Sequence, residues 1–254
     1  MSSLILPNGK VDNIKMVIFD KDGTLIDVHH YWCSMIEFRA EFFIKSLQVE
    51  NIDKNTLYDE LVDGMGIDLK TKKMKSEGPV GIKPRDFIVE VAFNIMKKYD
   101  NSYKKSDVID IFLKVDEYSK SKLNDIVKPL NGVVKLLENL KQNNILMSIA
   151  TTDLSTRAIL AMEKLNLKKY FTDIAGADLV KNPKPNADLV EYILDKQNLN
   201  ILDVVVVGDS MADLNMAKNA KCKFLAVKTG LYTEEFLLKS EKIIENLTQV
   251  RVVI

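Results

Sequence analysis

"MVIFDKDGTLID", residues 16–27, begins as an apolar run and then presents two acids, Asp20 and Asp22, followed at once by Gly-Thr. Four consecutive apolar residues ahead of the acids are typical of a short buried strand. Two carboxylates so close together at a strand end repel each other, and burying them is costly unless a positive charge lies beside them. The segment therefore predicts a strand that ends in a cation-binding site.

Outward from this segment, short apolar runs alternate with amphipathic ones. The runs suited to buried strands are residues 14–19, 145–150, 201–207 and 224–227. Segments with apolar residues at helical spacing are 131–142, 155–165, 186–196 and 211–220. Strands that alternate with helices in this way are parallel and joined by helical crossovers. The sequence therefore predicts an α/β fold with a doubly wound parallel sheet.

Residues 28–128 interrupt this alternation, because helical patterns such as "WCSMIEFRAEFFIKSL" dominate there and no convincing strand run occurs. A segment of about 100 residues is too long to be a plain loop in a compact domain. We expect residues 28–128 to form a helical cap domain inserted after the first strand. Residues 1–27 and 129–254 then form the α/β core domain.

Composition limits the partners of this chain of 254 residues. Lys and Arg together number 36, as do Asp and Glu, so no overall field attracts nucleic acid or an anionic membrane. The apolar stretch in the opening "MSSLILPNGK" is too short for a signal peptide or a membrane span. We expect a cytoplasmic protein, monomeric or homodimeric, in which Cys33 and Cys222 are free thiols.

Ligands of open α/β sheets bind beyond the carboxyl ends of the strands. Asp209 and Asp213 follow the run 201–207, and with Asp20 and Asp22 they would place four carboxylates in a small volume. Ligands that are all oxygen favour a hard cation, and Mg²⁺ usually shares its shell with a substrate phosphate. The acids therefore predict a Mg²⁺ site that handles phosphate.

Donors for a phosphate follow the other predicted strands. Thr151 ends the run 145–150 with a hydroxyl and nearby backbone N–H groups, and Lys184 lies between prolines in "KNPKPNAD". Such groups stabilise the charge that moves during phosphoryl transfer. No GxxxxGK[ST] or GxGxxG motif occurs, which disfavours a nucleotide-loop enzyme.

Taken in order, "FDKDGTLID", the Thr that closes the second apolar run, "KP" ahead of a helix and "VVVVGDSMADLNMA" resemble the haloacid dehalogenase (HAD) superfamily. The chain is most similar to its capped phosphatase branch, the phosphoglycolate phosphatase and β-phosphoglucomutase group. The resemblance implies that Asp20 is a nucleophile that forms an aspartyl-phosphate. It also implies that Asp22 protonates the leaving alcohol and later activates water.

The resemblance further assigns the Mg²⁺ ligands and the phosphate contacts. It implies that the metal binds the Asp20 carboxylate, the main-chain oxygen of Asp22 and Asp209, with Asp213 supporting it directly or through water. It places Thr151 and Thr152 at the phosphoryl group, and it has Lys184 neutralise both Asp20 and the phosphate. The chain departs from the family pattern at Lys21, where an apolar residue is commoner, at Thr152-Asp153 and at Lys221.

The substrate class is predicted from residues 76–86, "SEGPVGIKPRD", whose Gly and Pro residues indicate a loop between cap helices. The loop carries Lys83 and Arg85, and Arg is suited to binding a carboxylate through two parallel hydrogen bonds. We therefore expect a small acidic phosphomonoester of the phosphoglycolate kind. A phosphosugar mutase and a non-catalytic binding module remain alternatives, whereas Asp22 disfavours a dehalogenase, which needs no proton donor there.

Overall fold

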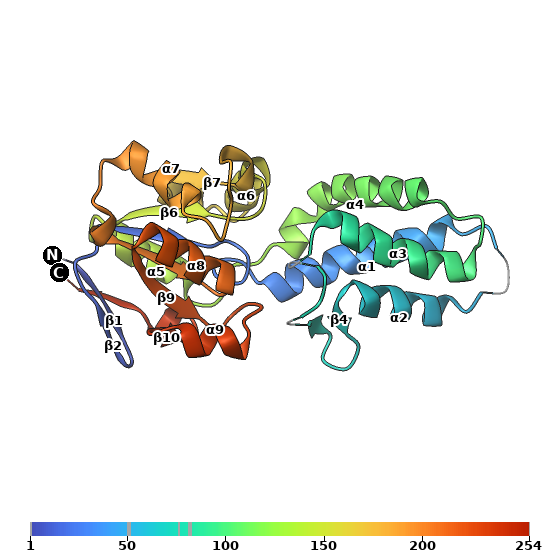
Figure 1. Cartoon of the computed structure of the whole chain (residues 1–254), viewed down its shortest axis with the longest axis horizontal. Coiled ribbons are helices and arrows are strands. Elements are labelled where there is room, and N and C mark those ends of the chain that lie inside the picture. The colour runs from blue at the N-terminus through green and yellow to red at the C-terminus, as the bar shows by residue number, and fades with distance from the viewer. Residues whose placement is uncertain (1, 50–51, 76, 81–82, 254) are drawn as a thin grey trace. The chain divides into compact units, whose positions relative to one another are not determined.

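The computed structural model describes residues 2–49, 52–75, 77–80 and 83–253. The chain divides into two compact units (Figure 1). The first, called here the α/β unit, comprises Met1–Asp27 and Val127–Ile254, and the second, the helical unit, is Val28–Ile126.

A six-stranded sheet forms the centre of the α/β unit, in the order β10-β9-β8-β3-β6-β7, and every neighbouring pair is parallel. The strands are β3 (Met16–Phe19), β6 (Leu146–Ala150), β7 (Asp173–Ala175), β8 (Val204–Gly208), β9 (Lys223–Val227) and β10 (Ile243–Ile244). The predicted α/β class and its parallel sheet are thereby confirmed. Because β3 lies between β6 and β8, residues after these three strands meet at one edge of the sheet.

Helices cover the sheet between these strands. They are α5 (Val133–Gln142), α6 (Ser155–Lys164), α7 (Asp188–Gln197), α8 (Met211–Ala220) and α9 (Glu234–Lys239), with short 3-10 turns at Lys168–Tyr170, Ala177–Leu179, Ile201–Asp203 and Leu247–Gln249. Met16 and Ile18 of β3 belong to a buried cluster with residues of α7 and α8. Side chains alternate across a strand, so Val17 and Phe19 face the other side, where they are equally buried. All four apolar residues of β3 therefore enter the core.

Two predicted strands begin at least two residues later than expected, and β6 begins one residue later. Residues 201–203 form a 3-10 turn, because the Asn200 side chain accepts a hydrogen bond from the Leu202 N–H, and Leu202 is 62% exposed. β8 therefore begins at Val204. β3 begins at Met16 rather than residue 14. Asn13, just before the predicted run, has a left-handed backbone (φ 56°).

Some strands were not predicted at all. The strands β1 (Ser3–Leu6), β2 (Gly9–Val11) and β11 (Arg251–Val253) form an antiparallel sheet in the order β11-β1-β2. Its pairing of β1 with β11 brings the two ends of the described chain together. The segment Val28–Ile126 thus follows the first strand of the parallel sheet, which is the third strand of the chain. β7 and β10 were also missed, because three and two residues are too few for a recognisable run.

The helical unit contains α1 (Val28–Ser46), α2 (Lys54–Met65), α3 (Arg85–Tyr99) and α4 (Lys105–Ile126). The expectation of an insert without strands was wrong in one detail, because β4 (Ile67–Asp68) and β5 (Lys73–Met74) pair as a small antiparallel hairpin. Of the loop predicted at residues 76–86, residues 76, 81 and 82 lie outside the described residues. Among the helices described in either unit, none is both long and apolar enough to span a membrane.

Candidate active site

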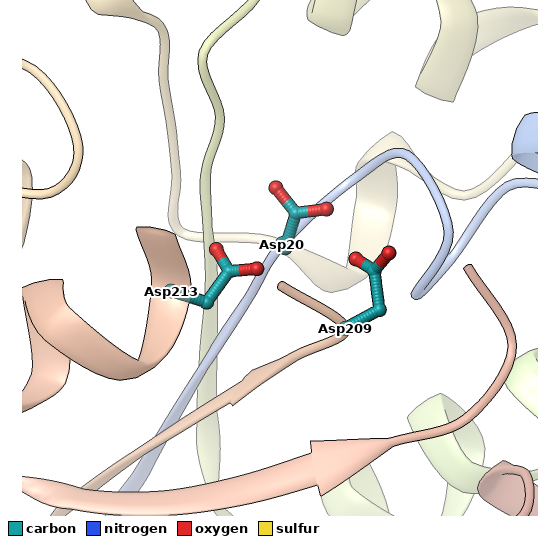
Figure 2. Close-up of side chains that lie close together, drawn as sticks. All are labelled: Asp20, Asp209 and Asp213. Carbon is teal, nitrogen blue, oxygen red and sulfur yellow. The ribbon is translucent and has the colours of Figure 1, made fainter. Parts of the chain in front are cut away.

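Three carboxylates converge beyond the carboxyl ends of β3 and β8. Asp20 directly follows β3, Asp209 follows β8, and Asp213 lies in the first turn of α8. Each offers an oxygen within 4.8 Å of the others, and all three residues are buried (Figure 2). The Asp20 N–H donates to the Val207 carbonyl (2.8 Å), which joins the two strand ends. The structure therefore gathers three of the four predicted acids.

Lys184 is the positive charge of this cluster. Its buried Nζ donates to Asp20 Oδ1 (2.5 Å) and to Asp213 Oδ1 (2.6 Å). Burial alone lowers the pKa of Lys184, but the two carboxylates outweigh burial and raise that pKa above its ordinary value. Lys184 therefore stays an ammonium ion. It lies beside Asp20, as the family resemblance implied.

The second oxygen of Asp213 fixes the start of α8. The Ser210 hydroxyl and backbone N–H both donate to Asp213 Oδ2 (2.6 and 3.1 Å), and the Asp213 N–H donates back to the hydroxyl. This reciprocal capping box leaves Asp213 Oδ1 for Lys184. The helix terminus thus orients one oxygen of Asp213 toward the cluster.

One lysine does not compensate three buried acids. Burial, followed by repulsion from neighbouring carboxylates, raises the pKa of Asp209 well above its ordinary value. Burial likewise raises the pKa of Asp20 to about 7, although Lys184 opposes this rise. A divalent cation among these oxygens would favour their ionised forms, and oxygen-only donors suit a hard ion. The three carboxylates therefore fit the cation that the sequence predicts.

A loop after β9, missed by the sequence analysis, holds Asp209. The Leu231 N–H donates to Asp209 Oδ2 (3.0 Å), and the Thr229 hydroxyl donates to the Gly23 carbonyl (2.6 Å). A Cβ on Gly230 would lie 1.8 Å from Asp209 Oδ2, and one on Gly23, whose φ is +88°, would lie 2.4 Å from the same oxygen. Both positions therefore require glycine. The signal was available, since "KTGLY" directly follows the run 224–227.

Asp22 is placed differently from the three clustered acids. Its carboxylate is bound by Lys21, whose Nζ lies 2.7 Å from both Asp22 oxygens. The backbone of Asp22 pairs with Ile26 in a tight loop, within which the Gly23 N–H donates to the Ile26 carbonyl (2.8 Å). The side chain of Asp22 thus belongs to an ion pair that the sequence analysis did not foresee.

Thr151 directly follows β6 and is almost wholly buried. Its Oγ1 accepts a hydrogen bond from the Asp153 N–H (3.2 Å), and its own N–H donates to the Ala175 carbonyl (2.9 Å). Thr152 is exposed. Because β6 is paired with β3 in register up to Ile149 opposite Phe19, the loop that carries Thr151 begins beside Asp20.

Lys83 and Arg85 belong to the helical unit. Lys83 is exposed, and Arg85 begins α3 rather than lying in a loop. The Arg85 guanidinium donates to Asp116 Oδ2 of α4 (2.6 Å) and lies over the Phe112 ring. Arg85 therefore already has a carboxylate partner within its own unit.

The sequence of the chain is similar to those of known proteins. The family model of haloacid dehalogenase-like hydrolases matches residues 17–227. A phosphoglycolate phosphatase of Vibrio parahaemolyticus is 24% identical over 86% of this chain and 85% of its own length. A phosphorylated carbohydrates phosphatase of Thermotoga maritima is 28% identical, with 82% of each chain covered.

The fold is also found among solved structures. A Thermotoga maritima protein provisionally described as β-phosphoglucomutase superposes with a TM-score of 0.66, at 22% identity, over 92% of this chain and 95% of its own. At that identity the likeness concerns the fold alone. The likeness extends over most of this chain.

Proposed function

The chain belongs to the haloacid dehalogenase-like hydrolase family, and from this premise we propose that it is a Mg²⁺-dependent phosphatase of a small phosphomonoester. The observation that carries the proposal is the buried contact between Asp20 and Lys184 beside two further acids. A carboxylate paired with a lysine, at a place suited to a cation, can attack phosphorus while the negative charge of the phosphoryl group is compensated. Relatives described as phosphatases of small phosphorylated compounds support the same reaction.

Asp20, Asp209 and Asp213 would hold the Mg²⁺, together with the main-chain oxygen of Asp22. When bound, the ion would compensate charge on the transferring phosphoryl oxygens. Lys184 contributes a second positive charge at the same place, because its ammonium group already contacts Asp20. Thr151 and the exposed Thr152 would donate hydrogen bonds to the phosphoryl oxygens.

The reaction proceeds in two displacements. An Asp20 carboxylate oxygen forms a bond to phosphorus while the bond to the ester oxygen breaks, and Asp22 supplies the proton that the departing alcohol needs. In the second displacement Asp22 takes a proton from water, whose oxygen attacks phosphorus. The bond to Asp20 then breaks, inorganic phosphate leaves, and both carboxyl groups return to their initial state.

A screen of phosphate esters tests this proposal. Purified protein with Mg²⁺ is expected to release inorganic phosphate from an aryl phosphate and from at least one small alkyl phosphate, and excess chelator should abolish both. The panel includes a sugar phosphate, for which a mutase would yield an isomer instead of inorganic phosphate. Failure to hydrolyse any ester with Mg²⁺ would contradict the proposal.

Recognition of an acidic substrate by Lys83 and Arg85 stays a prediction. If it is right, Lys83→Ala and Arg85→Ala each lower kcat/KM for a phosphorylated carboxylic acid roughly tenfold, because a charge-assisted hydrogen bond is lost. An uncharged aryl phosphate should be nearly unaffected. Lys97→Ala, at an exposed lysine of α3, serves as the control. Equal responses of the two substrates would exclude carboxylate recognition.

A further inference from the structure

Lys21 is a buried cation outside the three-carboxylate cluster. Its side chain is 3% exposed, and its Nζ lies 2.7 Å from each oxygen of Asp22 and 3.3 Å from Asp153 Oδ2. Burying an ammonium group is costly unless carboxylates compensate it. Asp22 and Asp153 therefore both compensate the buried charge of Lys21.

The two acids belong to different loops of the α/β unit. Asp22 lies in the loop after β3, and Asp153 lies in the loop after β6 that also carries Thr151. Asp153 is itself fixed, since its Oδ1 accepts a hydrogen bond from the Leu154 N–H (2.8 Å) and its N–H donates to Thr151 Oγ1 (3.2 Å). Lys21 therefore links Asp22 to the segment that presents Thr151.

The backbone on either side of Lys21 is also fixed. Its carbonyl accepts hydrogen bonds from the Leu25 and Ile26 N–H groups (2.9 Å each), and Ile26 pairs with Asp22. The Asp22 carboxylate is about one-fifth exposed, so without a partner it could adopt several rotamers. In the ionised form both oxygens contact Lys21 Nζ. In the protonated form the oxygen without the proton can still accept from Lys21, so the group keeps one orientation.

We propose that Lys21 is a positioning residue for the proton transfers of Asp22, holding that carboxylate by both oxygens and anchoring it through Asp153 to the Thr151 loop. This inference rests on the proposed function, because it concerns the same two-step phosphoryl transfer. Catalysis gains when a reacting group is already oriented. Lys21 contacts neither the substrate nor the phosphoryl group in this scheme, and it acts only through Asp22.

The role predicts a selective defect in Lys21→Met. In single-turnover experiments with enzyme in excess and Mg²⁺ present, alcohol release from an alkyl phosphate should slow roughly ten- to one hundredfold. Release of p-nitrophenolate from p-nitrophenyl phosphate should change less than about twofold, since that leaving group needs no proton. Asp153→Asn should show the same pattern more weakly. Because this variant keeps Lys21, it still tests the positioning role if Lys21→Met fails to fold.

A double variant gives the sharper test. If Lys21 acts through Asp22, then Lys21→Met added to Asp22→Asn should slow alkyl ester cleavage no further than Asp22→Asn alone. Equal slowing of both esters by Lys21→Met, or additive losses in the double variant, would overturn the positioning role while leaving the phosphatase intact. Wild-type protein that cleaves neither ester would overturn the proposed function and this role together.

Discussion

Asp20→Asn is expected to reduce phosphatase turnover by at least about 10⁴-fold with Mg²⁺ and aryl phosphate at saturating concentrations. The amide keeps the shape of the side chain but cannot form the bond to phosphorus, and it removes one of the three clustered carboxylates. Mass spectrometry of acid-quenched wild-type protein should show the mass of one added phosphoryl group, which the variant should lack. Asp195→Asn, an exposed acid of α7, is the matched control.

The loss in Asp20→Asn should not come from unfolding. Burial raises the pKa of Asp20 to about 7 from an ordinary 3.8, so the folded protein binds an extra proton between these values. Without metal, wild-type stability therefore falls relative to the variant as pH rises from about 4 to 7. Melting curves in chelator at pH 5 and pH 8 should show this difference. A variant that melts far below wild type at pH 8 would instead indicate that its inactivity reflects instability.

The centre of the site could be predicted from sequence because sheet topology places it. Asp20 and Asp209 each directly follow a buried apolar strand, and parallel strands present their carboxyl ends at one edge. The lysine in "KNPKPNAD" was more distant in sequence, yet its Nζ lies 2.5 Å from Asp20. Each of these charged residues lies at a predicted strand end or between prolines. Both features can be recognised in a single sequence, so the residues could be predicted.

The supporting contacts could not be predicted in the same way. Lys21 contacts a neighbour in sequence, Asp22, and a residue of another strand's loop, Asp153, and neither distance follows from periodicity. The roles of Gly23 and Gly230 depend on how closely two loops approach Asp209. Such contacts are set by tertiary packing, which residue types and spacing alone do not determine.

The short strands could not be predicted from the sequence for a related reason. β10 has two residues, and β1, β2 and β11 are stabilised by pairing between the first and last parts of the chain. Nothing within either segment alone distinguishes such strands from a surface loop. At residues 201–203 a strand was predicted where the structure has a 3-10 turn. The prediction relied on the apolar residue types there and did not consider the Asn200 side chain, which caps the turn.

Asp22→Asn should separate the two displacements. We expect alcohol release from an alkyl phosphate to slow roughly 10²–10⁴-fold, because the departing oxygen loses its proton donor. Phosphorylation by p-nitrophenyl phosphate should remain nearly normal, since that leaving group is stable as an anion. Hydrolysis of the aspartyl-phosphate should slow with both esters, because water loses its base. Mg²⁺ binding should persist, as the proposed ligand from this residue is its main-chain oxygen.

These unequal effects predict a burst in Asp22→Asn. Rapid mixing with p-nitrophenyl phosphate should release about one phenol per active site in the first, fast displacement, followed by much slower steady turnover. Phosphorylated protein should then accumulate. Peptide mapping after an acid quench should locate the phosphoryl group on Asp20. With the alkyl ester no burst should occur, because there the first displacement is slow. A variant in which both esters phosphorylate equally slowly would show that Asp22 is not the proton donor to the leaving group.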